Sequence, residues 1–504
     1  MSAPRLSDDA RALLAVAAAL LAGEEGYVVG GTLRDALLDR PIADLDLAVA
    51  GDAPGFARAL ADRLGGHFVL LDEERGTCRV ALDQGATRII DVALLRGDIV
   101  SDLGKRDFTI DTLAAPIEAL AAGAAVELID PHGGERDLRA GVVRLVSEQA
   151  LVDDPLRLLR AVRLAAQLDF RLAPETAEAL RRHAGRLGEA AAERQRDELS
   201  RMFATERAGP ALRLLDEVGL LERLFPEVTA ARGVTQPKEH YYDVFDHLLE
   251  TVAALDWMLA NEEPADARVE PLWRALWEAL AVEPALRPYL AVEVSEGRSR
   301  AALLKLAGLL HDVAKPETRA PDATGRIRFF GHAELGAETA RRVSRRLRFS
   351  RREVDLVATL VEEHLRPTQL GGDGPPTRRA LFRFFRDTGE AAESVLLLSL
   401  ADALAARGPG MDLDSWRGYA AYIARVLARR NEDDTIARPP RLLSGNELMA
   451  ALAIGPGPEV GRLLAAIEEA QAAGEVSTRE EALAFARRQP ANAPPALASA
   501  GGRP

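Results

Sequence analysis

The chain has 504 residues, of which 48 % are hydrophobic, and a net charge of −14. This length predicts two to four domains. The hydrophobic content excludes a wholly disordered chain. The negative net charge argues against a protein that coats nucleic acid non-specifically, since such proteins are usually basic. The single cysteine, Cys78, excludes a disulfide framework and a cysteine-based zinc site, which fits a reducing cytoplasm.

Residues 10–22, ARALLAVAAALLA, are the first predicted element. Their apolar run resembles the core of a secretory signal, but Asp8 and Asp9 precede it and Glu24 follows it. We therefore expect an amphipathic helix rather than a leader. No apolar run reaches the roughly 20 residues that a membrane-spanning helix needs. The chain is therefore expected to be cytoplasmic, without a membrane partner.

Most strand-like segments lie between residues 22 and 145, with short helical stretches such as 54–64 between them. From about residue 146 the apolar pattern becomes helical. We therefore predict an α+β chain whose small mixed sheet is followed by an all-helical remainder. A Pro/Ala/Gly-rich end from about residue 489 predicts disorder. The expected strands are YVVGG, LDLAVA, HFVLLD, RVALD, RIIDVALL, AVELID and VVRLV.

A glycine pair follows the first expected strand. Gly30 and Gly31 come directly after the apolar residues 27–29 and before a predicted helix. Glycines at this position let backbone N–H groups approach a phosphate, and a helix start favours an anion. Arg34 lies on the first turn, within reach of the same anion. Taken alone, the pair is more often an ordinary tight turn.

Two aspartates share one face of the next strand. Asp44 and Asp46 are two residues apart, so their carboxylates lie about 6–7 Å apart along that face. They repel each other unless a cation lies between them, and oxygen ligands suit Mg²⁺. Asp91, within RIIDVALL, is the candidate third carboxylate for phosphoryl transfer. The alternatives are a solvated strand face for the pair and a capped or edge-strand aspartate for Asp91.

Two further segments combine acids and cations. KRDFTIDTLA, residues 105–114, places Arg106, Asp107 and Asp111 at the mouth of an apolar segment. This mixture fits either a surface strand end or a nucleotide site. In DDPLRLLRAVR, charged residues recur at a helical spacing of three, which fits either a salt-bridged helix face or a ligand site. The recurring residues are Asp154, Arg157, Arg160 and Arg163.

A second group of candidate ligands lies in the helical region. It contains four of the eight histidines of the chain. An adjacent His-Asp pair with distant His and Asp partners can bind one or two divalent cations. Histidines satisfied in the core are the alternative for any single member. The group comprises His247, His311, Asp312, His332, His364 and Asp402.

The segments GGTLRD, DLDLAV, KRDFTIDTLA and LIDPHGGERDL, in this order between residues 30 and 138, resemble those of class II tRNA nucleotidyltransferases and bacterial poly(A) polymerases. The resemblance implies a polymerase-β-like head with Mg²⁺ on Asp44 and Asp46. The implied nucleotide contacts are Gly31 and Arg34 at the triphosphate, Arg106 and Asp107 at the ribose and phosphates, Asp154 and Arg157 at the base edge, and Arg160 and Arg163 at phosphates.

The chain departs from the family pattern at two positions. Asp111 stands where the family usually has Asn, which leaves sugar recognition there open. Asp153 precedes Asp154 where the family usually has Glu. The following segment ERQRDEL, residues 193–199, resembles a structural part of the family's neck.

The histidine group resembles an HD-superfamily phosphohydrolase domain. Some bacterial tRNA nucleotidyltransferases carry such a domain, which would bind a second divalent metal and act on phosphorylated or 2′,3′-cyclic RNA ends. We predict a nucleotidyltransferase head over 1–145, a helical neck that binds nucleotide and RNA over 146–235, an HD-type domain over 236–410, and a helical tail with a disordered end over 411–504.

The leading functional hypothesis is addition of CMP and AMP to the 3′ end of tRNA, from CTP and ATP with Mg²⁺. Addition of A alone, or of a poly(A) tail, uses the same motifs. A phosphohydrolase with an inactive head would require loss of the Asp44/Asp46 pair, and both residues are present. An RNA-binding module without catalytic activity is disfavoured by the negative net charge. The arginine cluster at 341–352 is expected to contact tRNA phosphates or to form a solvated helix face.

Overall fold

The computed structural model describes residues 4–489, apart from 75, 125, 282–283, 296, 371–374 and 433–439. The expected disordered end therefore lies almost entirely outside the described residues. The chain forms two compact units, residues 1–226 and 227–504, and each is described by itself. Among the described residues no helix is both long enough and apolar enough to cross a membrane.

The first unit contains a six-stranded sheet in the order β3-β4-β5-β2-β1-β6. The β2 and β5 strands pair in parallel, and the other neighbours are antiparallel. This mixed sheet with helices confirms the predicted α+β class. Its strands are β1 (Gly26–Val29), β2 (Asp44–Val49), β3 (His67–Asp72), β4 (Thr77–Ala81), β5 (Ile89–Leu94) and β6 (Ala114–Pro116).

Two expected strands were largely wrong. Within the described part of AVELID, only Ile129 makes a bridge, to Ala114. The chain turns there because the Asp130 carboxylate accepts the N–H groups of Gly134 and Glu135 at the start of the next helix. VVRLV contributes the short strand β7 (Val142–Val143), which pairs in parallel with β8 (Arg171–Leu172), and a single bridge from Leu145 to Phe108. The sheet edge is instead formed by β6.

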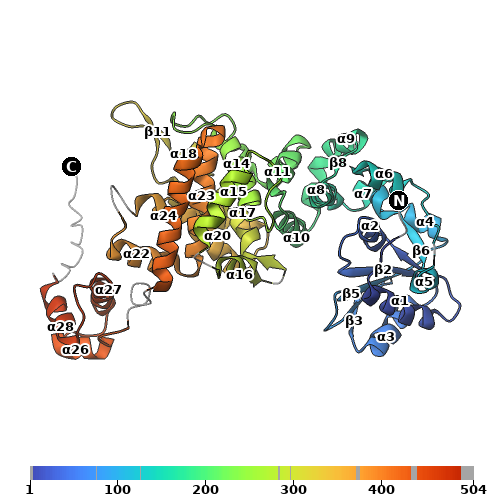
Figure 1. Ribbon diagram of the computed structural model, residues 1–504, viewed down its shortest axis with the longest axis horizontal. Helices are drawn as coiled ribbons and strands as arrows, with labels where there is room; N and C mark the ends of the chain where they lie inside the picture. Colours follow the sequence, from blue (N-terminus) through green and yellow to red (C-terminus); the bar gives the residue numbers. More distant parts are fainter. Residues whose placement is uncertain are drawn as a thin grey trace, which may run out of the picture. The chain divides into compact units, whose positions relative to one another are not determined.

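Helices cover the head sheet and continue beyond it. Leu45, Leu47 and Val49 are buried, and α1 and α3 lie on one side of the strands (Figure 1). Ser7 caps α1, which confirms the first expected helix. The helices of this unit include α1 (Asp8–Leu21), α2 (Gly31–Leu37), α3 (Ala53–Leu64), α4 (Ile99–Leu103), α5 (Ile117–Ala121), α6 (Gly134–Ala140), α7 (Gln149–Asp153), α8 (Arg157–Leu168), α9 (Pro174–His183), α10 (Ala192–Phe203), α11 (Ala208–Glu217) and α12 (Leu221–Leu224).

The second unit is mainly helical. The apolar helix α17 packs against α14, α20 and α23, and this core carries the histidine group. Its helices include α14 (Val244–Met258), α15 (Glu270–Leu280), α16 (Leu286–Ala291), α17 (Arg300–Leu310), α18 (Lys315–Thr318), α19 (His332–Arg346), α20 (Arg351–Glu363), α21 (Arg366–Gln369), α22 (Arg378–Thr388), α23 (Ala392–Arg407) and α24 (Leu413–Glu432).

Two hairpins and a terminal helix cluster complete the second unit. The hairpins are β9 (Glu293–Ser295) with β10 (Arg298–Ser299), and β11 (Arg319–Pro321) with β12 (Ile327–Phe329). The terminal helices have a core of their own that includes Leu448, Leu463 and Ile467. They are α26 (Gly445–Leu452), α27 (Pro458–Ala472) and α28 (Arg479–Arg488).

Candidate active site

Three aspartates come together on one face of the head sheet. Asp44 and Asp46 alternate along β2 with the buried residues Leu45 and Leu47. The parallel pairing with β5 places Asp91 directly beside Asp46. The structure therefore places the three aspartates that the sequence singled out at neighbouring positions of two paired strands.

The charges of these aspartates are compensated to different degrees. Burial raises the pKa of Asp46 to about 6, against the opposing effect of Arg106, and burial with the charge of Asp91 raises the pKa of Asp44. Asp91 instead accepts two hydrogen bonds from Arg79, at 2.8 Å each. Asp44 and Asp46 thus offer carboxylate oxygens whose charged form is disfavoured by burial, which fits the binding of a Mg²⁺ ion.

The sequence analysis missed Arg79. It lies on β4 opposite Asp91 in the antiparallel β4–β5 register, so the two side chains share one face. Its segment was correctly expected to be a strand, but only the register reveals the pairing. The same analysis missed Thr32, whose hydroxyl accepts the N–H of Asp46 at 2.7 Å and donates to the carbonyl of Asp44 at 3.2 Å.

A cavity of about 240 Å³ opens beside this aspartate row. It is enclosed by the glycine pair, parts of β2, β4 and β5, the 106–111 segment and one side chain of α8. The predicted site residues that line it are Gly30, Gly31, Asp46, Asp91, Arg106, Asp107 and Arg160, together with Asp111.

The backbone at Gly30 requires a residue without a side chain. Its φ is +64°, in the left-handed region, and an added Cβ would lie 2.6 Å from the Nη1 atom of Arg106. Glycine therefore lets the Arg106 guanidinium lie directly against the turn before α2. This close approach places one cation beside the aspartate row.

Two aspartates of the KRDFTIDTLA segment form ion pairs with arginines from two other elements. Asp107 pairs with Arg160 of α8 at 2.9 Å, and Asp111 pairs with Arg34 of α2 at 2.7 Å. Arg160 also lies 3.6 Å from Asp111. Lys105 is exposed. The mixed charges thus form a partly buried network around the cavity, with both aspartates buried, rather than a surface strand end.

Four predicted nucleotide contacts do not line this cavity and stay predictions. Arg34 is held by Asp35 and Asp111. Asp154 accepts hydrogen bonds from Arg194 at 2.7 and 3.2 Å, and Arg157 donates to the Ala150 carbonyl. Arg163 is buried and bonds to Glu198 at 2.5 Å and to Gln167 at 2.7 Å. Arg194 and Glu198 come from the segment 193–199 that the sequence indicated to be structural.

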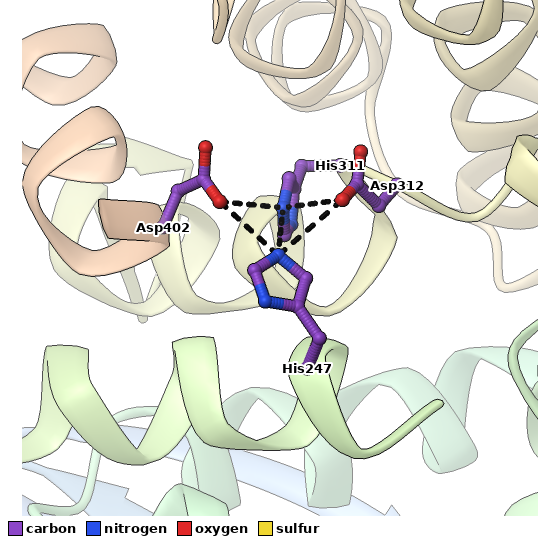
Figure 2. A group of neighbouring side chains, drawn as sticks. All are labelled: His247, His311, Asp312 and Asp402. Atoms are coloured by element: carbon purple, nitrogen blue, oxygen red, sulfur yellow. Dashed lines mark hydrogen bonds and ion pairs between the residues drawn. The ribbon is translucent and has the colours of Figure 1, made fainter. Parts of the chain in front are cut away.

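The second unit contains a buried cage of four candidate metal ligands (Figure 2). The Nε2 atom of His247 lies 3.1 Å from that of His311 and 3.1 Å from Asp402. Asp312 lies 3.3 Å from each of the two histidines. His247, His311 and Asp312 are at most 2 % exposed. Four donor atoms thus converge from α14, the end of α17 and α23.

Asp312 also faces a second set of ligands. Its Oδ1 atom lies 3.2 Å from Nε2 of His332 and 3.6 Å from Nε2 of His364. Among the described residues, these buried Oδ1 and Nε2 atoms have no partner in hydrogen-bond geometry. Asp312 therefore connects two groups of donors that could each hold one cation.

Backbone carbonyls orient three of the cage histidines. The Nδ1 atoms of His311, His332 and His364 lie 2.8, 2.6 and 2.7 Å from the carbonyl oxygens of residues 308, 329 and 361. Donation from Nδ1–H leaves Nε2 to face the cage as a metal ligand. The donor set therefore fits divalent metal. Without one, Asp312 and Asp402 hold the pKa of the buried His311 at about 10, so a proton is the competing cation.

The arginine cluster at 341–352 is partly neutralised within its own unit. Arg341 pairs with Glu362, Arg346 pairs with Glu227, and Arg352 lies 3.3 Å from Glu390. Contact of this cluster with tRNA phosphates stays a prediction.

Three segments of the chain match described protein families. Residues 26–101 match the "Poly A polymerase head domain", residues 169–232 the "Probable RNA and SrmB- binding site of polymerase A", and residues 244–407 the "HD domain". The head match includes the aspartate row, and the HD match includes all six residues of the histidine group.

Two relatives match nearly the whole chain. An A-adding tRNA nucleotidyltransferase from Deinococcus radiodurans is 38 % identical over 467 residues, which cover 92 % of this chain and 94 % of the relative. A CC-adding tRNA nucleotidyltransferase from Thermus thermophilus is 39 % identical over 468 residues, which cover 92 % and 93 %. The chain belongs to the tRNA nucleotidyltransferase family. The resemblance inferred from the sequence motifs is confirmed, and this family member is an enzyme.

Solved structures share the fold of this tRNA nucleotidyltransferase. The Thermotoga maritima CCA-adding enzyme complexed with tRNA has a TM-score of 0.54 at 21 % identity, covering 95 % of this chain and 93 % of that one. A CCA-adding enzyme in complex with CTP has a TM-score of 0.56 at 22 % identity, covering 94 % and 93 %.

Proposed function

We propose that the head adds CMP and AMP to the 3′ end of tRNA, taking them from CTP and ATP in the cytoplasm. The observation that carries the proposal is the pair Asp44 and Asp46 on one face of β2, of which Asp46 lines a cavity together with the glycine pair and Arg106. Membership of the tRNA nucleotidyltransferase family gives the substrate class.

In this reaction the terminal 3′-oxygen of tRNA attacks the α-phosphorus of the nucleotide. A new P–O bond forms, the bond to pyrophosphate breaks, and the hydroxyl proton passes to solvent water. Mg²⁺ on Asp44 and Asp46 would activate the hydroxyl and neutralise charge on the phosphates. Gly30 and Gly31 leave room for the phosphates, and Arg106 and Arg160 supply positive charge at the cavity wall. Asp154 and Arg157 would contact the base edge.

Primer extension on three tRNA transcripts tests this function. The transcripts end before the first C, after C and after CC, and each is incubated with Mg²⁺ and CTP, ATP or both. The proposal predicts that all three end in CCA when both nucleotides are present. If none of the three transcripts is extended under conditions in which an established CCA-adding enzyme extends them, the proposal is refuted.

Partial addition is a second candidate, because near-full-length relatives are named for A addition and for CC addition. An A-adding enzyme would extend only the CC-ended transcript, by one A. A CC-adding enzyme would extend the other two and stop at CC. A long A tail would instead indicate a poly(A) polymerase.

We also propose that the HD domain hydrolyses phosphate esters with divalent metal, such as phosphorylated or 2′,3′-cyclic RNA ends. The observation that favours this activity is Asp312, which connects two groups of donors with unpartnered Nε2 and carboxylate atoms. Hydrolysis would break a P–O ester bond by addition of water.

The hydrolase is tested with Mn²⁺-loaded protein and RNA ending in a 2′,3′-cyclic phosphate. Wild type should open the cyclic phosphate, and Asp312→Asn should not. Asp44→Asn is the matched control, because it alters only the head and should leave hydrolysis unchanged. Equal cleavage by wild type and Asp312→Asn would exclude the HD centre as the source.

A further inference from the structure

The segment of residues 233–243, here called the strap, precedes α14 and is fixed to several parts of the second unit. The Asp243 carboxylate accepts the N–H of Gly233 at 2.7 Å. The Tyr241 N–H donates to the carbonyl of Ala406 at 2.8 Å, and Glu239 accepts from Arg326 at 2.8 Å. The two ends of the strap are thus joined to each other, and its middle is bonded to Arg326 and to the helix that carries Asp402.

Two side chains of the strap reach the histidine cage. Gln236 accepts a hydrogen bond at 2.7 Å from the Lys315 ammonium, which also pairs with Asp312. The ring of His240 lies edge-on to that of His247, with 5.7 Å between centroids and 74° between planes. The Nδ1 atom of His240 is buried and has no hydrogen-bond partner in the part of the chain that the structure describes. His240 is therefore an unsatisfied polar group beside the cage, outside its set of ligands.

We propose that His240 binds a phosphate oxygen of the HD-domain substrate, together with Lys315. The inference rests on the proposed hydrolase function. A phosphate group carries oxygen acceptors that metal ions do not all occupy, and N–H donors satisfy the remainder. Lys315 has three N–H donors, of which Asp312 and Gln236 take two. Gln236 would then act as a positioning residue that orients Lys315.

Binding of inorganic phosphate to the full chain loaded with Mn²⁺ tests this assignment without relying on turnover, with Asp44→Asn and Asp46→Asn present in every protein compared so that the head holds no metal. Isothermal titration calorimetry gives the phosphate affinity, and elemental analysis gives the metal content. His240→Ala should weaken phosphate binding about tenfold, as expected for loss of one hydrogen bond to a charged group, with wild-type metal content. His240→Asn keeps a donor and should restore part of the affinity. Lys238→Ala, an exposed position on the same strap, is the matched control and should bind like wild type.

Each contrary result has a distinct meaning. Unchanged phosphate affinity in both His240 variants would overturn the role of His240 and leave the hydrolase proposal standing. Loss of bound metal from both variants would also overturn it, because His240 would then support the cage rather than the phosphate. If metal-loaded wild type binds no phosphate, the hydrolase proposal fails and this inference fails with it.

Discussion

Asp46 and Asp91 lie side by side in one register, yet their surroundings differ. Arg79 neutralises Asp91 through two hydrogen bonds, whereas burial leaves Asp46 with a raised pKa. A carboxylate of this kind is costly to ionise in the fold without a cation. A bound metal ion would offset this cost, which supports the assignment of Asp46 as a ligand.

The raised pKa predicts how the metal-free head responds to pH. Because the pKa of Asp46 rises from 3.8 to about 6 on folding, its contribution to stability is fully present below 3.8 and is lost as pH rises through 6. Thermal unfolding of EDTA-treated wild type and Asp46→Asn, at about pH 5 and about pH 7.5, measures the part of this contribution that is lost between the two pH values. Wild type should lose more stability than the variant between the two values, and Mg²⁺ should restore it at the higher one. An equal loss in both proteins would contradict the prediction.

Asp111 anchors the cation network at the cavity. Its carboxylate is 3 % exposed and lies 2.7 Å from Arg34. Asp111→Asn removes one partner of a buried ion pair, so we expect the free energy of unfolding to fall by about 1–3 kcal/mol in urea denaturation. Asp35→Asn is the control, because it removes a more exposed partner of the same arginine and should cost less than about 1 kcal/mol. A larger fall in the free energy of unfolding for Asp35→Asn than for Asp111→Asn would mean that Asp35, and not Asp111, anchors the arginine.

At the scale of elements, the turn before α2 joins the glycine pair to the aspartate row. Gly30→Ala would place a Cβ 2.6 Å from Arg106, at a φ of +64°. We expect the guanidinium to be displaced and the KM for nucleotide to rise about tenfold or more in steady-state extension assays. Gly23→Ala carries a similar backbone strain, with a φ of +96°, but its Cβ would meet nothing within 4 Å. An equal rise in KM for both variants would assign the effect to strain rather than to Arg106.

The sequence predicted the elements of the head better than their pairing. The alternation of Asp44, Leu45 and Asp46 sufficed for a two-faced strand, and β-branched residues marked five of the six strands. Strand β6, Ala-Ala-Pro, has no such residues and was missed, while AVELID has them and forms only a single bridge in its described part. Asp130 caps the next helix there, a local hydrogen bond that competes with the ladder.

The features of the two sites that the sequence did not predict depend on contacts between segments that are far apart in the chain. The pairing of Arg79 with Asp91 depends on the β4–β5 register. The double role of Asp312 depends on how α17, α19 and α20 pack, because His332 and His364 approach one oxygen and His247 the other. Residue types and spacing identified all these aspartates and histidines as ligand candidates, but not their grouping into two sets.

At the scale of the whole molecule, two compact units contain two separate sets of candidate ligands. The aspartate row lies within residues 1–226 and the histidine cage within residues 227–504. Since no ligand is shared between them, each metal site should be removable alone. We predict that Asp312→Asn lowers the Mn²⁺ content of the purified chain, by elemental analysis, and leaves the rate of nucleotide addition unchanged. A parallel loss of nucleotide addition would contradict the separation.

Nucleotide addition by the head is the central claim, and the most direct measurement is incorporation of labelled CTP and ATP into tRNA lacking CCA. Wild type, the double variant Asp44→Asn, Asp46→Asn, and Asp312→Asn are compared with Mg²⁺ present. We predict incorporation by wild type and Asp312→Asn, and a loss of at least about 1,000-fold in the double variant, because the metal ligands of the transfer reaction are removed. Incorporation by the double variant at the wild-type rate would contradict the account.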